Sequence, residues 1–200
     1  FGWRGESRSV YAQTVRALAN DMGLSSRYLT DKTGDCPRCA SGEFGVEASD
    51  EIVEAIVFYT ANLGPPPREN AAAPDILAGR AEFHLAGCAF CHTPSWRTAP
   101  QAAAPWLGDQ TIWPYTDLLL HDMGEGLADG ASSEWRTPPL WGLGRNGDVN
   151  GNAVYLHDGR ARSILEAILW HGGEAAAARD AVAALPAERR QALLVFLGSL

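Results

Sequence analysis

Apolar residues recur every three or four positions in several stretches of the chain, a spacing that predicts α-helices with one buried face. Residues that start and end helices bound these stretches: serine or aspartate N-caps, proline at a first turn, and glycine or proline after the last turn. The predicted helices cover about 9–22, 49–63, 74–86, 163–171 and 186–200. The pattern therefore predicts a mainly α fold.

The region between Trp106 and Arg160 sustains neither a helical nor a strand period and is rich in Gly, Pro, Asp, Asn and Trp. A loop this long inside a compact domain is usually functional. We therefore predict a long irregular central insertion.

Two of the predicted helices resemble each other and suggest two domain endings. Aligned without gaps, 49–63 and 186–200 pair Glu51 with Glu188, Ala55 with Ala192, Tyr59 with Phe196, and Leu63 with Leu200. The second copy ends the chain, so the first is expected to end an earlier domain. We predict that 1–64 are the C-terminal part of an upstream domain, 65–73 a Pro-rich linker, and 74–200 a second domain.

Within the second domain, the first and last helices are expected to pack together. Gly79 and Phe83 lie one turn apart on the first helix, and a glycine lets two helices approach closely. The last helix offers an apolar stripe that consists of Leu193, Leu194, Phe196 and Leu197.

The helix at 74–86 runs directly into Cys88-Ala-Phe-Cys91-His92. In a CxxCH motif of this kind the two cysteines reach the haem vinyl groups and the histidine coordinates iron from the proximal side. The alternative is a redox or zinc-binding CxxC followed by an unrelated histidine. The helix order favours haem c, and we expect 74–200 to be a cytochrome c-like haem domain, preceded by the helical tail of a second such domain.

A second CxxC, Cys36-Pro-Arg-Cys39, is followed by Ala40 and therefore lacks the iron ligand. We expect it to carry no haem. A local disulfide is the first interpretation, and a thioredoxin-like pair or a metal half-site are the alternatives.

A six-coordinate haem needs a distal ligand as well as His92. His171 ranks first, because the helix that Ser163 caps, with Leu165, Ile168 and Leu169 facing inward, would hold it rigidly; a histidine favoured by the helix dipole is the alternative. Met123 ranks second and His157 third. His84 and His121 complete the candidates, and His84 is expected at the surface.

Side chains around the haem are predicted from the same regions. His157 is expected to bond Asp158 or a haem propionate, and an arginine fork could pair with the propionates. The arginine candidates are Arg136, Arg145, Arg160 and Arg162. Most of Trp106, Trp113, Trp135, Trp141 and Trp170 are expected to pack the haem crevice and the long loop.

Composition narrows the partners. The chain has 200 residues, 46% of them apolar, and a formal net charge of -8 from 16 basic and 24 acidic residues. This charge offers no attraction to nucleic acid or to an anionic membrane, and no apolar run approaches the roughly 18 to 20 residues of a membrane helix. We expect neither partner. Because haem attachment of this kind takes place outside the bacterial cytoplasm, we expect a periplasmic protein whose leader, and more, preceded Phe1.

Several motifs follow one another in the order typical of one family. They occupy 88–92, 115–124, 134–144, 155–161 and 167–175. On these motifs the chain closely resembles the di-haem oxidoreductases of the peroxidase type. It is more distantly similar to the bacterial di-haem cytochrome c peroxidases, in which a methionine ligand occupies the place of His171. The resemblance therefore implies that His92 and His171 are the two axial ligands of the iron. It also implies that this haem lacks the high reduction potential that a methionine ligand gives.

The relatives carry two haems in two cytochrome c-like domains, and in the peroxidases the N-terminal haem meets peroxide while the C-terminal haem supplies electrons. The resemblance implies that this chain is the electron-transfer half, with the reactive haem upstream of Phe1 or on another chain. It also implies calcium between the domains, held partly by carbonyls before Tyr155, although Asn152-Ala-Val154 lacks the usual proline.

We therefore expect the c-type haem electron-transfer portion of a periplasmic di-haem oxidoreductase, a haem-dependent enzyme of the peroxidase type. Its expected partners are an upstream haem domain or second chain and a small redox protein as electron donor or acceptor. A mono-haem cytochrome c carrier without its own catalysis is the alternative, and a thiol-disulfide oxidoreductase using Cys36 and Cys39 is a third hypothesis.

Overall fold

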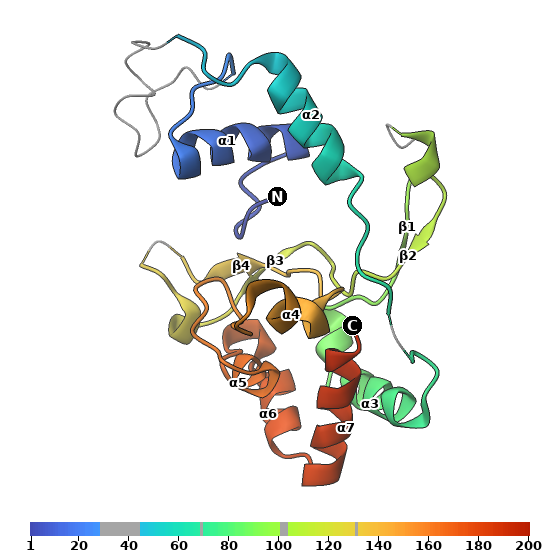
Figure 1. Ribbon diagram of the computed structural model, residues 1–200. Coiled ribbons are helices and arrows are strands. Elements are labelled where there is room, and N and C mark those ends of the chain that lie inside the picture. The colour runs from blue at the N-terminus through green and yellow to red at the C-terminus, as the bar shows by residue number, and fades with distance from the viewer. Residues whose placement is uncertain (29–44, 69, 101–103, 131) are drawn as a thin grey trace. The chain divides into compact units, whose positions relative to one another are not determined.

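The computed structural model of the chain describes residues 1–28, 45–68, 70–100, 104–130 and 132–200. The described residues contain seven α-helices and four strands of two or three residues, so the fold is mainly α as predicted (Figure 1). Their contacts divide the chain into two units, 1–64 and 65–200. Cys36 and Cys39 lie outside the described residues.

The first unit contains α1 (Val10–Met22) and α2 (Asp50–Ala61). The Ser9 hydroxyl accepts a hydrogen bond from the Ala12 amide at 3.1 Å and so caps α1 as an N-cap serine should. The small core of this unit consists of Val15, Leu18, Ala48 and Val53. The prediction that this unit is the tail of a cytochrome c-like domain stays a prediction.

The apolar side chains of α2 are mostly exposed. Val53 is its one buried residue, whereas Ile52, Ile56 and Tyr59 are 51%, 36% and 65% exposed. Leu63, just after the helix, is 58% exposed. The four exposed residues follow the helical spacing of one face, so α2 carries an apolar stripe that extends beyond its core contact.

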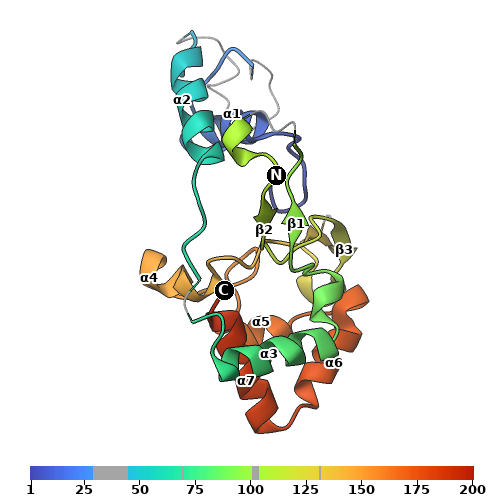
Figure 2. The same cartoon turned by 90° about the vertical axis from the view of Figure 1, so that its right-hand side faces the viewer.

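In the second unit, α3 (Pro74–Leu85) and α7 (Ala187–Gly198) lie side by side, as both views show (Figures 1 and 2). The predicted pairing of these helices is confirmed, because Phe83 of α3 and Phe196 of α7 have ring centroids 5.4 Å apart. Tyr115 joins them, and all three rings are fully buried. These rings form the centre of the core of this unit.

The helix α5 (Ile164–Leu169) begins at the predicted cap, where the Ser163 hydroxyl accepts from the Glu166 amide at 3.0 Å. The inward face of α5 differs from the prediction. Ile164 and Ile168 pack against the core, whereas Leu169 is 48% exposed. The short α6 (Ala176–Ala183) follows and contributes the buried Val182.

The central region contains more regular structure than the sequence predicted. Two antiparallel pairs occur there, β1 (Trp96–Arg97) with β2 (Thr111–Ile112), and β3 (Leu120–Asp122) with β4 (Glu134–Arg136). A five-residue helix, α4 (Asn146–Asn150), follows. Strands of two or three residues are too short to produce a recognisable alternation of apolar and polar positions.

In the part of the chain that the structure describes, no helix is long and apolar enough to cross a membrane.

Candidate functional site

The CxxCH motif lies at the end of α3. Gly87 turns the chain with a φ of 85°, and Cys88–Phe90 then form one 3-10 turn. The His92 amide donates to the Cys88 carbonyl at 3.0 Å, which closes the motif into a compact loop. Cys88 and Cys91 form no disulfide with a described cysteine. Burial raises the pKa of the Cys88 thiol to about 11 and also raises the pKa of Cys91.

The raised pKa values bear on the alternative interpretation of this motif. A redox CxxC works through a cysteine whose pKa is lowered toward neutrality, because the thiolate is the nucleophile. The Cys88 and Cys91 thiols are shifted in the opposite direction. Their environment therefore does not favour thiol-disulfide chemistry.

The His92 ring is oriented by a backbone carbonyl. Its Nδ1 lies 3.0 Å from the carbonyl oxygen of Tyr115. Because a carbonyl only accepts hydrogen bonds, Nδ1 carries the hydrogen and Nε2 keeps its lone pair. Burial lowers the pKa of His92 to about 4, so the ring is neutral near pH 7. A neutral imidazole with a free Nε2 is the form that ligates metal.

The His171 ring is held in the same way from the other segment. It follows the C-cap of α5, and its Nδ1 lies 2.7 Å from the carbonyl oxygen of Ala167. Burial lowers the pKa of His171 as well. The two rings are close enough that a charge on His171 would lower the pKa of His92. Within the described residues, the structure therefore offers two neutral imidazoles, and neither Nε2 has a hydrogen-bond partner there.

This donor set fits a c-type haem. Imidazole nitrogens are common axial ligands of haem iron, and metal-bound histidines usually donate the other ring N–H to a carbonyl or carboxylate. His92 and His171 each do so with a backbone carbonyl. Two thiols at the same loop complete the groups that covalent haem attachment requires. The chain thus offers two thiols and two imidazoles that could attach a haem and ligate its iron.

Met123, the second-ranked distal ligand, lies beside the His171 segment. Its amide donates to the Ser133 carbonyl at 2.9 Å, just beyond the β3–β4 pair. A Cβ on Gly172 would be 2.8 Å from the Met123 carbonyl oxygen. The Met123 backbone therefore touches the residue after His171, and both candidates belong to the same side of the site.

His157, the third candidate, is engaged by an aromatic ring. It stacks on Trp135 with centroids 3.6 Å apart, and its Nε2 lies 3.8 Å from Asp158. The Arg160 Nε pairs with the same carboxylate at 2.6 Å, and its guanidinium lies 4.9 Å from the Trp170 ring centroid. At 3.8 Å the His157–Asp158 contact is too long for the expected hydrogen bond, while Arg160 belongs to the same cluster.

The other predicted side chains are placed more variably. The guanidinium of Arg145 pairs with Asp148 at 3.2 Å, and Arg136 donates to the Thr137 carbonyl at 3.3 Å. The Arg162 guanidinium has no polar contact with the described residues, while its amide donates to Glu166. His84 is exposed, as expected. Among the tryptophans, Trp106 and Trp113 are 59% and 55% exposed, so these two do not pack the loop as expected.

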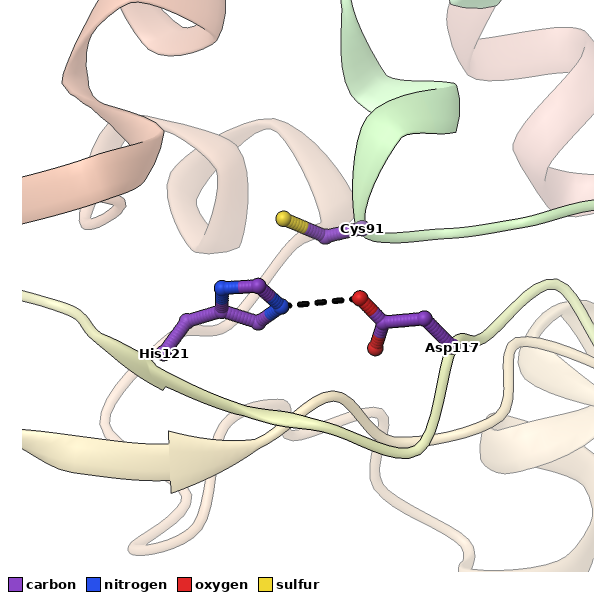
Figure 3. Close-up of side chains that lie close together, drawn as sticks. All are labelled: Cys91, Asp117 and His121. Atoms are coloured by element: carbon purple, nitrogen blue, oxygen red, sulfur yellow. Dashed lines mark hydrogen bonds and ion pairs between the residues drawn. The ribbon is translucent and has the colours of Figure 1, made fainter.

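His121 occupies a position that the sequence did not reveal. Its Nε2 lies 2.8 Å from Asp117 and its Nδ1 lies 2.8 Å from Glu174, and the hydrogen bond to Glu174 is the main cause of a raised pKa. Both ring nitrogens are therefore occupied by carboxylates. Figure 3 shows the His121–Asp117 pair directly below Cys91, and ligand-type atoms of the three residues lie within 4.8 Å of one another.

The sequence also missed the carbonyls that orient the two rings. The Ala167 carbonyl could have been found, because Ala167 lies on α5 four positions before His171, about one helical turn away. Tyr115 gave no such signal. It is 23 positions away from His92 in the sequence, and only the fold brings its carbonyl to the ring. Its φ of 54° is also unusual for a non-glycine residue.

The carbonyl before Tyr155 is already used within the chain, since Val154 accepts a hydrogen bond from Asn146 at 2.6 Å. Calcium at this position stays a prediction.

Comparison with known families gives one match. A family model described as "Di-haem oxidoreductase, putative peroxidase" matches residues 1–200, and therefore includes both units. No curated protein and no solved structure matches the chain.

Proposed function

Since this chain belongs to the family of di-haem oxidoreductases, we propose that it is the c-type haem electron-transfer portion of a periplasmic di-haem oxidoreductase with peroxidase activity. The observation that carries this proposal is the pair of neutral imidazoles, His92 and His171, each with Nδ1 bonded to a carbonyl and Nε2 unused. A haem attached here supplies one-electron redox chemistry.

Each residue of the site has a distinct part in this proposal. Cys88 and Cys91 would hold the haem covalently, and His92 and His171 would hold its iron from the two sides. If His92 and His171 both ligate it, the iron would have no open position for peroxide. Tyr115 and Ala167 fix the ring orientations through their carbonyls. We therefore assign this centre to electron relay, and the reaction with peroxide to another haem.

The second haem of the family is proposed to lie upstream of Phe1 or on another chain. The exposed stripe of α2, consisting of Ile52, Ile56 and Tyr59 with Leu63, supports this proposal. In the sequence alignment with α7 these positions correspond to residues that include Leu193 and Phe196, which are fully buried in the core of the second unit. We propose that the stripe of α2 packs against an upstream haem domain or second chain in the same manner.

Removal of the distal imidazole tests the ligand assignment. In His171→Ala the ferric haem is expected to change from low-spin to high-spin, as measured by absorption and electron paramagnetic resonance spectra. Met123→Leu is the comparison variant and is expected to keep the low-spin spectrum. An unchanged spectrum in His171→Ala, or a high-spin spectrum in Met123→Leu, would overturn His171 as the ligand.

A mono-haem electron carrier is the second candidate function, and the single CxxCH motif in the sequence favours it. Haem counting by mass on the full-length gene product, combined with peroxide turnover, separates the two functions. Two haems with turnover support the di-haem oxidoreductase. One haem without turnover supports the carrier and contradicts the peroxidase proposal.

A further inference from the structure

Asp117, His121 and Glu174 form a continuous line of side chains beside the CxxCH motif. The His121 ring bridges the two carboxylates, with 2.8 Å between Nε2 and Asp117 and 2.8 Å between Nδ1 and Glu174. Figure 3 shows the His121 and Asp117 side chains pointing toward each other below Cys91. Asp117 and His121 are four residues apart, whereas Glu174 follows His121 by 53 positions.

At one end, Asp117 is tied to the proximal ligand. The Asp117 amide donates to the Cys91 carbonyl at 2.8 Å. Two residues earlier, the Tyr115 carbonyl accepts from His92 at 3.0 Å, and between them the Thr116 amide donates to the Thr93 carbonyl at 2.9 Å. These three hydrogen bonds fix the position of Asp117 relative to the His92 ring.

At the other end, Glu174 is tied to the distal segment. It lies in the 3-10 turn Gly173–Ala175, which follows His171 and Gly172 directly. One Glu174 oxygen accepts from the Asp122 amide of β3 at 2.9 Å, while the other meets His121. Glu174 therefore fastens the turn that follows His171 to the strand that carries His121.

The network is more sheltered than a surface ion pair. The side chains of Asp117 and His121 are 10% and 17% exposed, whereas Glu174 is 56% exposed. Interactions between poorly exposed charges are weakly screened by salt. A second hydrogen bond, from the Leu119 amide to Asp117 at 3.0 Å, limits the carboxylate to one orientation. The bridge is thus rigid at its Asp117 end. At its Glu174 end the side chain is exposed, so a substitution there disturbs little packing.

We propose that Asp117, His121 and Glu174 are positioning residues that hold the His171 segment at a fixed place relative to His92, and that breaking this bridge frees the distal side of the haem. The inference rests on the proposed function, because it needs His92 and His171 as iron ligands. None of the three residues itself ligates the iron.

Glu174→Gln is the sharpest test. The amide oxygen can still accept from Asp122, but glutamine carries no negative charge, so the charge-assisted hydrogen bond to His121 is lost and the bridge is weakened at its exposed end with little risk to folding. The measurement is the dissociation constant of added imidazole for the ferric holoprotein, together with the high-spin fraction. Changes to groups that orient a metal ligand commonly alter binding or activity 10- to 100-fold. We expect imidazole to bind about 10-fold more tightly to Glu174→Gln than to the unchanged protein.

Two matched controls separate positioning from a general effect of losing charge. Asp109→Asn is also an acid-to-amide change, and it removes the exposed Arg97–Asp109 pair of the β1–β2 region. His84→Gln removes an exposed histidine whose side chain has no polar contact with the described residues. Both controls are expected to keep the imidazole affinity of the unchanged protein, whereas His121→Gln should behave like Glu174→Gln.

The double variant His121→Gln/Glu174→Gln should bind imidazole no more tightly than either single variant, because one bridge can be broken only once. The proposal is overturned if Glu174→Gln and His121→Gln both match the controls while His171→Ala binds imidazole tightly. If His171→Ala itself leaves the spectrum unchanged, the ligand assignment of the proposed function fails instead. The two failures are therefore distinguishable.

Discussion

Gly79 of α3 lies directly against the Ala192 carbonyl of α7. A Cβ at Gly79 would stand 2.0 Å from that oxygen and 2.6 Å from the Phe196 Cβ. The helix backbones can approach this closely only without a side chain at Gly79. This contact brings Phe83 and Phe196 together and fixes the end of α3, from which the CxxCH motif follows.

We expect Gly79→Ala to destabilise the second unit by about 2–3 kcal/mol, because the added methyl group forces the helices apart. Gly198→Ala is a matched control, since Gly198 is also helical but a Cβ there meets nothing within 4 Å. It should be neutral or stabilising by up to about 1 kcal/mol. Urea unfolding curves measure both effects, and equal midpoints for the two variants would contradict the close contact.

The same helix pair is joined by a bidentate ion pair between Glu82 and Arg189, with N–O distances of 2.7 and 2.8 Å. The Glu82 side chain is only 12% exposed. We expect Glu82→Gln to lower the free energy of unfolding by about 1–2 kcal/mol, since hydrogen bonds between charged groups are among the stronger ones. Thermal unfolding measures the loss.

Asp180→Asn provides the control for Glu82→Gln. It removes the exposed Arg179–Asp180 pair, in which the Asp180 side chain is 68% exposed. Exposed pairs contribute little, so a change within about 0.5 kcal/mol is expected. If both variants lost the same stability, the Glu82–Arg189 pair would be no more than a surface pair.

Local signals in the sequence predicted the helices and the haem motif. Ser9, Ser163 and Pro186 mark where α1, α5 and α7 begin, because capping depends on a few adjacent residues. The pairing of α3 with α7 was predictable, since Gly79 and Phe83 form a recognisable face. The strands β1 to β4 were not, because their pairing depends on contacts between residues that are far apart in the chain.

The candidate site divides in the same way. Cys88, Cys91 and His92 lie within five consecutive residues, so the sequence alone predicts their chemistry. The orienting Tyr115 carbonyl and the bridge from Asp117 to Glu174 depend on three-dimensional placement. Glu174 follows His121 by 53 positions, and no periodicity links them. The sequence did not distinguish His121 from the other histidines. The fold does, because it places a carboxylate against each of its ring nitrogens.

The two CxxC motifs should differ in haem attachment. Cys88→Ser and Cys91→Ser each remove one thiol of the CxxCH motif, and each variant should lose one covalent link, so that the double variant releases its haem on acid extraction. Cys36→Ser/Cys39→Ser is the control, because Ala40 stands where a haem motif has its histidine. It should retain one covalent haem by intact mass. Loss of covalent haem from this control alone would contradict the assignment.

The turn after His171 is expected to be sensitive to a single methyl group. Gly173 has a φ of 50°, and a Cβ there would stand 2.2 Å from the Asp122 carbonyl oxygen and 2.7 Å from the Gly124 amide nitrogen. Gly173→Ala should therefore push the His171 segment away from β3. We expect a loss of about 2–4 kcal/mol in unfolding free energy, which combines overpacking with the cost of a left-handed alanine.

Gly130→Ala separates the two contributions to this loss. Gly130 also has a positive φ, 87°, but a Cβ there meets nothing within 4 Å. It should lose only the conformational part, about 1–2 kcal/mol. In the holoprotein, Gly173→Ala alone should raise the high-spin fraction, because the displaced turn directly follows His171. A low-spin spectrum in both variants would show that the Gly173 contact does not position the distal ligand.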